Sequence, residues 1–171
     1  MHLIRTYDFE TVKRKYIEVT EHTPDIEKYA RWIYGKHPTD ESLQAYIDRG
    51  EMYVLTDGEK IAGMAAVAMC QGEEYMNISW KDDLACDEAA AVHLLAICPE
   101  YRGRSLGIRI LEEAMDIAVR SGKKALRLDT LKSNLPARRM YDRAGFVCRG
   151  EQRLYAENTG MADFLYFEKI P

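Results

Sequence analysis

The sequence predicts a mixed α/β fold, built as one domain over residues 1–171 around a sheet of about six or seven strands flanked by helices. An apolar strand pattern at 91–97, a helical pattern at 105–120 and a second strand pattern at 125–130 follow one another. This order is typical of a right-handed parallel unit. A turn sequence inside 52–70 predicts an antiparallel hairpin as well, so the sheet is expected to be mixed.

The first half of the chain alternates strand and helix patterns. They cover 2–7 (strand), 8–21 and 25–50 (helix), and 52–56 with 60–70 (hairpin). The segment His37-Pro38-Thr39-Asp40 breaks the second helical pattern. Thr39 or Asp40 can cap a helix over 41–49, because both side chains accept hydrogen bonds from first-turn amides. The polar, acidic segment 71–87 fits either an extended hairpin or a loop.

The second half is more regular. The helix at 105–120 has one apolar face and Gly122 ends it. The strand at 125–130 alternates apolar and polar residues. The last patterns are a short helix from Pro136 to Gly145, a strand from Phe146 and a strand over 163–169.

Composition excludes several classes of protein. With 47% hydrophobic and 30% charged residues, the chain is typical of soluble globular proteins, and its net charge of −4 argues against a nucleic-acid partner. The longest uncharged run, 61–70, is far shorter than the roughly 20 residues of a membrane span. We therefore expect no membrane association and a cytoplasmic location. The four cysteines form no CxxC pair, which predicts reduced thiols and no metal site; they are Cys70, Cys86, Cys98 and Cys148.

The join between the strand at 91–97 and the next helix is unusually rich in glycine and arginine. Gly103 and Gly107 would let a phosphate approach the amides of a helix start, where the helix dipole favours negative charge. Arg102 and Arg104 would add positive charge. A simple helix entry with solvated arginines explains the same residues, and the pattern is not a Walker loop.

Two segments together resemble the GNAT superfamily of N-acetyltransferases. Residues 102–107, Arg-Gly-Arg-Ser-Leu-Gly, are similar to the family motif Q/R-x-x-G-x-G/A, and residues 134–146 are similar to N-x-x-A-x-x-x-Y-x-x-x-G-F. The similarity covers 91–147, and the two motifs together are far more specific than either alone. Ser105 departs from the pattern, since it stands where the first motif glycine usually lies.

The resemblance implies acetyl-CoA as cosubstrate, held where the strands at 91–97 and 125–130 splay apart. It implies that the pyrophosphate lies on the loop amides, that an amide near Ile97 stabilises the oxyanion, that Asn134 binds the pantetheine, and that Tyr141 protonates the leaving thiolate. The implied cofactor contacts are Leu95, Ala96, Ile97, Arg102, Gly103, Arg104, Ser105, Leu106, Gly107, Ile108, Asn134, Ala137 and Tyr141.

His93 is the candidate base, because it lies where many relatives carry a glutamate and a neutral imidazole can take a proton from an ammonium. A hydrogen-bonded structural histidine is the alternative. Other candidates for the base are Glu73, Glu74 and Asp87. A covalent mechanism through Cys98 is not expected, since the sequence offers no basic partner to activate that thiol.

The expected function is therefore an N-acetyltransferase that uses direct attack, in a sequential mechanism, by a primary amine of a small molecule or an exposed peptide. The alternative from another class is a non-catalytic module that binds acyl-CoA and regulates a partner. The acceptor site is expected between the early helices and the segment 75–80, where Trp32 and Tyr34 are candidate lining residues. Acidic residues in that segment favour a cationic acceptor. Many relatives pair as dimers, so a homodimer is possible.

Overall fold

The computed structural model describes residues 1–156 and 160–171, in which seven strands form one mixed sheet of order β1-β2-β3-β4-β5-β7-β6. This confirms the predicted mixed α/β fold. The strands are β1 (Leu3–Arg5), β2 (Met52–Asp57), β3 (Lys60–Ala68), β4 (Ala89–Ile97), β5 (Ala125–Leu131), β6 (Val147–Ala156) and β7 (Gly160–Lys169). Among the strand pairs of the described residues, only that of β4 with β5 is parallel.

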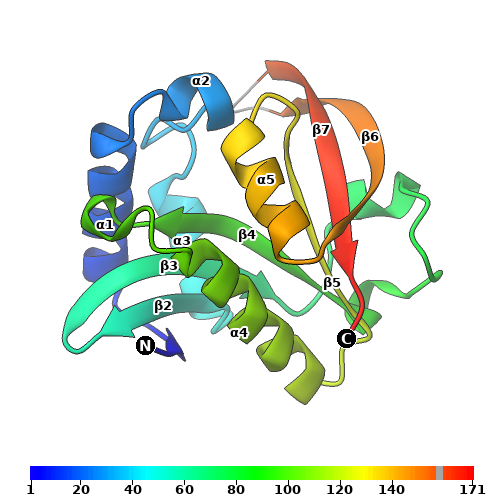
Figure 1. Ribbon diagram of the computed structural model, residues 1–171, viewed down its shortest axis with the longest axis horizontal. Coiled ribbons are helices and arrows are strands. Elements are labelled where there is room, and N and C mark those ends of the chain that lie inside the picture. Colours follow the sequence, from blue (N-terminus) through cyan, green and yellow to red (C-terminus); the bar gives the residue numbers. More distant parts are fainter. Residues whose placement is uncertain (157–159) are drawn as a thin grey trace.

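The parallel pair separates part of the way along, as expected. Its register runs from Ala89↔Ala125 to Val92↔Leu128 and goes no further, although β4 continues to Ile97. The register between β3 and β4 shifts at this point, and Leu94 has a φ of 53°, which is rare for a residue with a side chain. A bulge at Leu94 therefore bends β4 away from β5 and opens a gap in the sheet (Figure 1).

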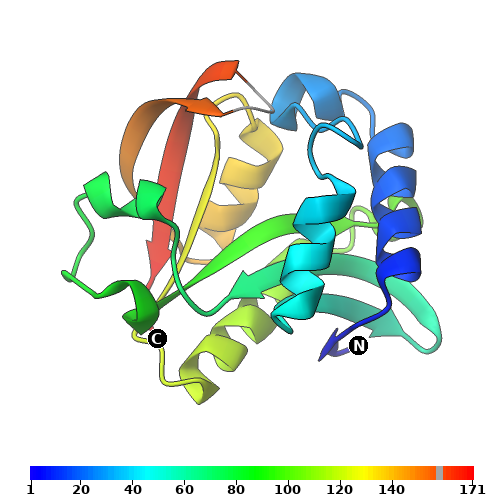
Figure 2. The same ribbon diagram turned by 180° about the vertical axis from the view of Figure 1, so that it is seen from behind.

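Helices cover both faces of the sheet. They are α1 (Phe9–His22), α2 (Ile26–Ala30), α3 (Asp40–Asp48), α4 (Leu106–Arg120) and α5 (Leu135–Arg143). Figures 1 and 2 show α4 and α5 on one face and α1 with α3 on the other. The buried side chains accordingly form two main clusters, one beneath α4 and one beneath α1 and α3. No helix in the described ranges is long and apolar enough to cross a bilayer.

The predicted helical segment 25–50 is only partly helical. It contains α2 and α3, and residues 31–39 between them form turns. Thr39 is the N-cap of α3, and its hydroxyl accepts a hydrogen bond from the Ser42 amide at 3.1 Å. Residues 31–39 are not helical because Gly35 and Pro38 disfavour a helix between the two short apolar faces.

The segment between β3 and β4 is a loop with two short 3-10 helices, Glu73–Asn77 and Cys86–Glu88, rather than an extended hairpin. A disulfide joins Cys70 to Cys86 at the ends of this loop. The expectation that all four cysteines are reduced is therefore wrong for this pair. The spacing of the cysteines does not indicate this pairing, because Cys70 and Cys86 meet only after the chain folds back from the end of β3 to the start of β4.

Candidate functional site

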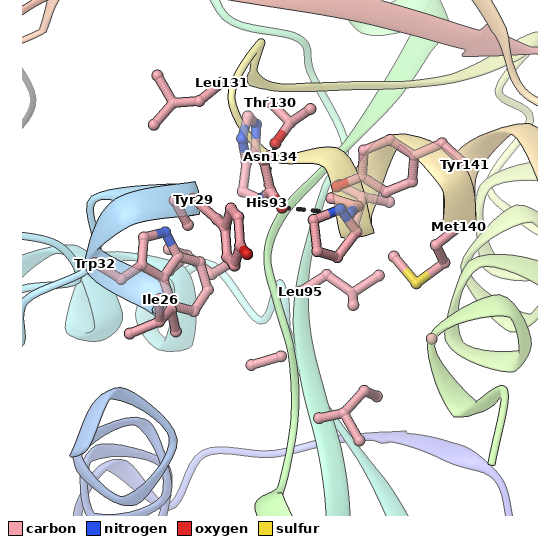
Figure 3. Close-up of a pocket in the computed structure, with 18 of the residues that line it drawn as sticks. Ile26, Tyr29, Trp32, His93, Leu95, Thr130, Leu131, Asn134, Met140 and Tyr141 are labelled. Atoms are coloured by element: carbon pink, nitrogen blue, oxygen red, sulfur yellow. Dashed lines mark hydrogen bonds between the residues drawn. The ribbon is translucent and has the colours of Figure 1, made fainter. Parts of the chain in front are cut away.

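A pocket of about 900 Å³ lies where β4 and β5 diverge. His93, Tyr141 and every residue whose contact with acetyl-CoA the resemblance implies line it, together with residues of α2, the loop between β3 and β4, and the β6–β7 hairpin. In Figure 3, Ile26, Tyr29 and Trp32 lie on one side, Met140 and Tyr141 lie on the other, and Leu95 of β4 lies between. The volume of the pocket falls in the usual range for ligand-binding pockets.

One end of the pocket offers free backbone amides. Among the described residues, none accepts a hydrogen bond from the amides of residues 103–107. Gly103 has a φ of 74° and a Cβ there would meet no atom within 4 Å, so an anion can approach closely. Ser105 has a φ of 56°, a left-handed conformation that explains why a glycine would suit this position. The loop and the start of α4 thus form an anion-binding concavity.

The arginines at this end do not act alike. The Arg102 guanidinium donates to the Thr23 hydroxyl and to the His22 carbonyl oxygen (3.0 Å), so it anchors the loop to the end of α1 instead of facing the amides. Arg104 lies over the ring of Tyr101, 5.3 Å from its centroid. Arg143, which the sequence analysis missed, reaches toward the loop with one nitrogen 3.5 Å from the Ser105 hydroxyl.

Gly107 and Asn134 have structural roles that the sequence did not reveal. A Cβ at Gly107 would collide with the sulfur of Met140, so glycine here lets α5 pack closely on α4. The Asn134 side chain caps α5: its oxygen accepts from the Ala137 amide at 3.3 Å and its nitrogen donates to Thr130 at 3.2 Å. Both residues line the pocket, and contact of Asn134 with pantetheine stays a prediction.

Tyr141 lies at the inner end of the pocket and is 7% exposed. Its ring packs against Phe146 and Phe167. Burial raises the pKa of Tyr141, the negative charge of Asp129 raises it further, and a hydrogen bond with Thr130 counteracts them in part. The phenol therefore holds its proton and can donate it.

His93 lies beside a carboxylate that the sequence analysis did not single out. Its Nδ1 atom is 4.0 Å from Oδ1 of Asp129, and both side chains are about one-fifth exposed, at 21% and 24%. Two atoms at this separation can both accept a hydrogen bond from one amine nitrogen placed between them. The His93 ring is stacked with Tyr46 at a centroid distance of 6.0 Å and meets the edge or face of Tyr75 at 6.1 Å.

The remaining residues that the sequence offered as candidates differ in whether they line the pocket. Glu74 lines the pocket, whereas Glu73 and Asp87 lie outside its lining. Trp32 also lines the pocket, but the Tyr34 hydroxyl donates to Asp40 at 2.6 Å instead. Burial raises the pKa of the Cys98 thiol to about 11, which keeps it unreactive and supports the expectation that it is not a nucleophile. Neighbouring residues in the sequence do not reveal which of these candidates line the pocket, because that depends on how the folded chain packs.

A signal for Asp129 was present in the sequence. Asp129 is a charged residue inside a strand whose other positions are mostly apolar, and it belongs to the strand that leads into the Asn134 segment. A charge placed at the end of a largely buried strand next to a motif is a reasonable site candidate. The segment 75–80 was expected beside the acceptor site, but the contact of Tyr75 with Asp129 follows from the path of the loop. Arg143 offered no comparable signal, since its position follows from α5.

Comparison with known proteins identifies relatives over most of the chain. The acetyltransferase (GNAT) family model matches residues 16–146. An uncharacterised N-acetyltransferase of Archaeoglobus fulgidus is 23% identical over 117 residues, which are 68% of this chain and 66% of that relative. The chain thus spans slightly less than two thirds of that relative's length.

Solved structures share the fold. A GNAT acetyltransferase of Streptococcus agalactiae superposes with a TM-score of 0.79 at 18% identity, covering 99% of this chain and 95% of its own. A proposed acetyltransferase of Salmonella typhimurium, solved with its cofactor acetyl-CoA, superposes with a TM-score of 0.70 at 16% identity, covering 99% and 93%. At these identities the similarity concerns the fold alone.

Proposed function

Because the chain belongs to the acetyltransferase (GNAT) family, whose members use acetyl-CoA, we propose that it transfers an acetyl group from acetyl-CoA to a primary amine. One observation carries the proposal: a single pocket joins an anion-binding loop at one end to His93, Asp129 and Tyr141 at the other. The loop fits a pyrophosphate, and the three side chains fit proton transfer around an acyl carbonyl.

The chain's own groups would hold acetyl-CoA in the gap of the sheet. The free amides of residues 103–107 would bind the pyrophosphate, with Arg104 and Arg143 adding positive charge. The edge of β4 at Leu95–Ile97 no longer pairs with β5, so its backbone is available to an extended pantetheine arm. The role of Arg102 would be indirect, because its guanidinium fixes the loop to α1.

Proton transfers set the roles of the three side chains. An amine must lose a proton as it attacks, and His93 and Asp129 are placed to accept it from one nitrogen. Tyr141 remains protonated and would donate to the departing thiolate. Attack is direct, since Cys98 is buried and its raised pKa disfavours a thiolate.

Charge along the pocket narrows the acceptor. The arginines of its lining are Arg102, Arg104 and Arg143, all near the loop, whereas the carboxylates are Glu74 and Asp129, near His93. An acceptor with a carboxylate next to its amine would place two like charges together with no Lys or Arg among the described lining residues at that end. The preferred acceptor is thus a cationic amine without an adjacent carboxylate, on a small molecule or at the end of a peptide.

The proposal is tested by measuring coenzyme A release in the presence of a panel of amines, together with thermal stability at increasing acetyl-CoA. We expect acetyl-CoA to raise the melting temperature, by an amount that grows as the logarithm of its concentration, and an amine to trigger thiol release. Stabilisation without thiol release from any amine would favour the alternative, a non-catalytic acyl-CoA-binding module. No stabilisation at millimolar acetyl-CoA contradicts the proposal.

A further inference from the structure

The carboxylate of Asp129 is held by a residue of the loop between β3 and β4. The Tyr75 hydroxyl donates to Oδ1 of Asp129 at 2.6 Å, and the Tyr75 side chain is fully buried. Oδ1 is also the atom that lies 4.0 Å from His93. The Tyr75 bond uses one lone pair of Oδ1, so it holds the carboxylate in place while Oδ1 can still accept a second hydrogen bond on the side of His93.

Tyr75 belongs to a short 3-10 helix, which by itself cannot hold a side chain rigidly. Two aromatic rings supply the missing support. The Tyr75 ring stacks on Trp80 at a centroid distance of 5.8 Å and an interplanar angle of 15°, and it meets Tyr166 at right angles at 5.3 Å. In addition, the Trp80 indole donates to the Tyr75 carbonyl oxygen at 2.7 Å.

Trp80 in turn lies under a buried cation. The Arg127 guanidinium is 4.1 Å from the Trp80 ring centroid and forms an ion pair with Glu168 at 3.0 Å, both side chains being fully buried. It also donates to the Gln71 side chain at 2.6 Å and to the Asp82 carbonyl at 3.1 Å. A buried ion pair with this many partners keeps its geometry, because breaking it would leave an unpaired charge.

Arg127 and Asp129 are two residues apart on β5, so their side chains face the same side of the sheet. That side is the one covered by the loop. One strand therefore carries both the carboxylate and the anchor of the loop residue that holds the carboxylate. Both partners of the hydrogen bond between Tyr75 and Asp129 are thus held in place, Asp129 by its strand and Tyr75 through Trp80 and Arg127, which distinguishes it from a chance surface contact.

We propose that Tyr75 is a positioning residue for acetyl transfer: its hydroxyl orients the Asp129 carboxylate toward the acceptor amine, and Arg127 keeps Tyr75 in place through Trp80. This inference rests on the proposed function, in which Asp129 and His93 accept the amine proton. The hydroxyl also stabilises the charged carboxylate, which keeps it ready to receive an ammonium group. Besides Tyr75 and His93, the titratable groups that interact electrostatically with Asp129 are His37, Tyr46, Tyr141 and Tyr166.

The variant Tyr75→Phe tests the proposal, because it removes one hydroxyl and keeps the ring that packs against Trp80. A hydrogen bond to a charged group contributes about 1.5–3 kcal/mol, so kcat/KM for the amine is expected to fall by about 10- to 100-fold. Acetyl-CoA affinity should be unchanged. The loss should appear in kcat/KM for the amine and be absent from the KM for acetyl-CoA, a difference that a general loss of structure would not produce.

Tyr53→Phe is the matched control, because it also removes a buried tyrosine hydroxyl with one side-chain partner, Arg5 at 3.1 Å, in β2 away from the pocket. It should leave both kcat/KM for the amine and the KM for acetyl-CoA unchanged. In an Asp129→Asn background, Tyr75→Phe should add little further loss, because the two residues act as one unit. Full loss on top of Asp129→Asn contradicts the proposal.

A readout without substrate separates this inference from the proposed function. The carboxyl carbon of Asp129 can be followed by carbon-13 NMR in the free protein, and its resonance should shift in Tyr75→Phe but stay unchanged in Tyr53→Phe, because only the first variant removes a hydrogen bond to that carboxylate. An unchanged resonance in Tyr75→Phe, or a kcat/KM of Tyr75→Phe within twofold of the wild type while Asp129→Asn is impaired, overturns the positioning role. Neither result bears on acetyl-CoA binding, which the thermal shift measures independently.

Discussion

Tyr141 combines two properties that a proton donor to a thiolate requires. Its ring is fixed between Phe146 and Phe167, and its raised pKa keeps the phenol protonated at and well above neutral pH. Its position on the same helix as Asn134 and Ala137 follows from their spacing of three and four residues. The proposed role of Tyr141 as proton donor can therefore be tested by a substitution that removes only its hydroxyl oxygen.

Tyr141→Phe is expected to lower kcat by about 10²- to 10⁴-fold, because the proton is transferred only as the carbon–sulfur bond breaks. Acetyl-CoA affinity should barely change, since the ring and its packing remain. In the wild type, the rate should show no decline from ionisation of this phenol up to about pH 10, because a raised pKa extends the range in which it is protonated. Steady-state kinetics with an acceptor whose chemistry limits turnover would check both points, and a kcat within twofold of wild type would make Tyr141 a packing residue.

The element that the sequence left undecided, the loop between β3 and β4, has the largest consequences for the site. It carries Glu74 to the pocket and places Tyr75 against Asp129, a residue of the pocket lining. The disulfide between Cys70 and Cys86 closes the loop over a separation of 16 residues. Its packing on the sheet depends on a small cluster of Tyr75, Ile78 and Tyr166 with Trp80 beside them. The disulfide therefore limits how far the loop can move away from the sheet.

Reduction of the disulfide is expected to lower the thermal stability. In the chain-entropy description, closing a loop of this length contributes about 3 kcal/mol, which corresponds to a decrease of roughly 6–12 °C for a protein of this size. Calorimetry with and without dithiothreitol measures the change. The Cys70→Ser/Cys86→Ser variant should melt at the temperature of the reduced wild type with or without dithiothreitol, and Cys148→Ser, which removes an exposed free thiol, is the control. Equal melting temperatures of oxidised and reduced wild type would contradict the expectation.

At the scale of the whole molecule, the sheet separates two kinds of charge along one pocket. The loop before α4, with Arg104 and with Arg143 from α5, makes one end positive, while Asp129 on β5 and Glu74 on the loop make the other end negative. The splayed strands connect these ends, so a cosubstrate with a phosphate end and an acceptor with an ammonium group can meet between them. No single element carries this polarity.

Phenethylamine and phenylalanine form a matched acceptor pair, because they differ by one carboxylate next to the amine. We expect kcat/KM to be at least about 10-fold higher for phenethylamine, since the carboxylate of phenylalanine would face Asp129 in a partly buried site. The preference should shrink at high salt only weakly, because buried charges are poorly screened. An equal or reversed preference would contradict the proposed acceptor class without affecting acetyl-CoA binding.

The sequence alone determined the strand–helix–strand unit, the loop rich in glycine and arginine, and the short helix with Asn134, Ala137 and Tyr141. These features depend on residues that are close in the chain, where helix periodicity, capping and glycine conformations act directly. The same locality explains why the cap of α3 is one of the two predicted candidates, Thr39. The single helical pattern over 25–50 contains two short helices, which residues 31–39 separate.

Only the tertiary structure decided which groups meet. Tyr75 and Asp129 are 54 residues apart, and Arg102 and Thr23 are 79 residues apart, so their contacts follow from sheet order and loop path. The bulge at Leu94 is similar: the fully buried Tyr16 of α1 donates to the Leu94 carbonyl at 2.6 Å and helps to hold a conformation that the chain would not favour locally. Burial and long-range contacts decide the protonation, orientation and accessibility of the side chains in the site. Neither follows from the spacing of neighbouring residues.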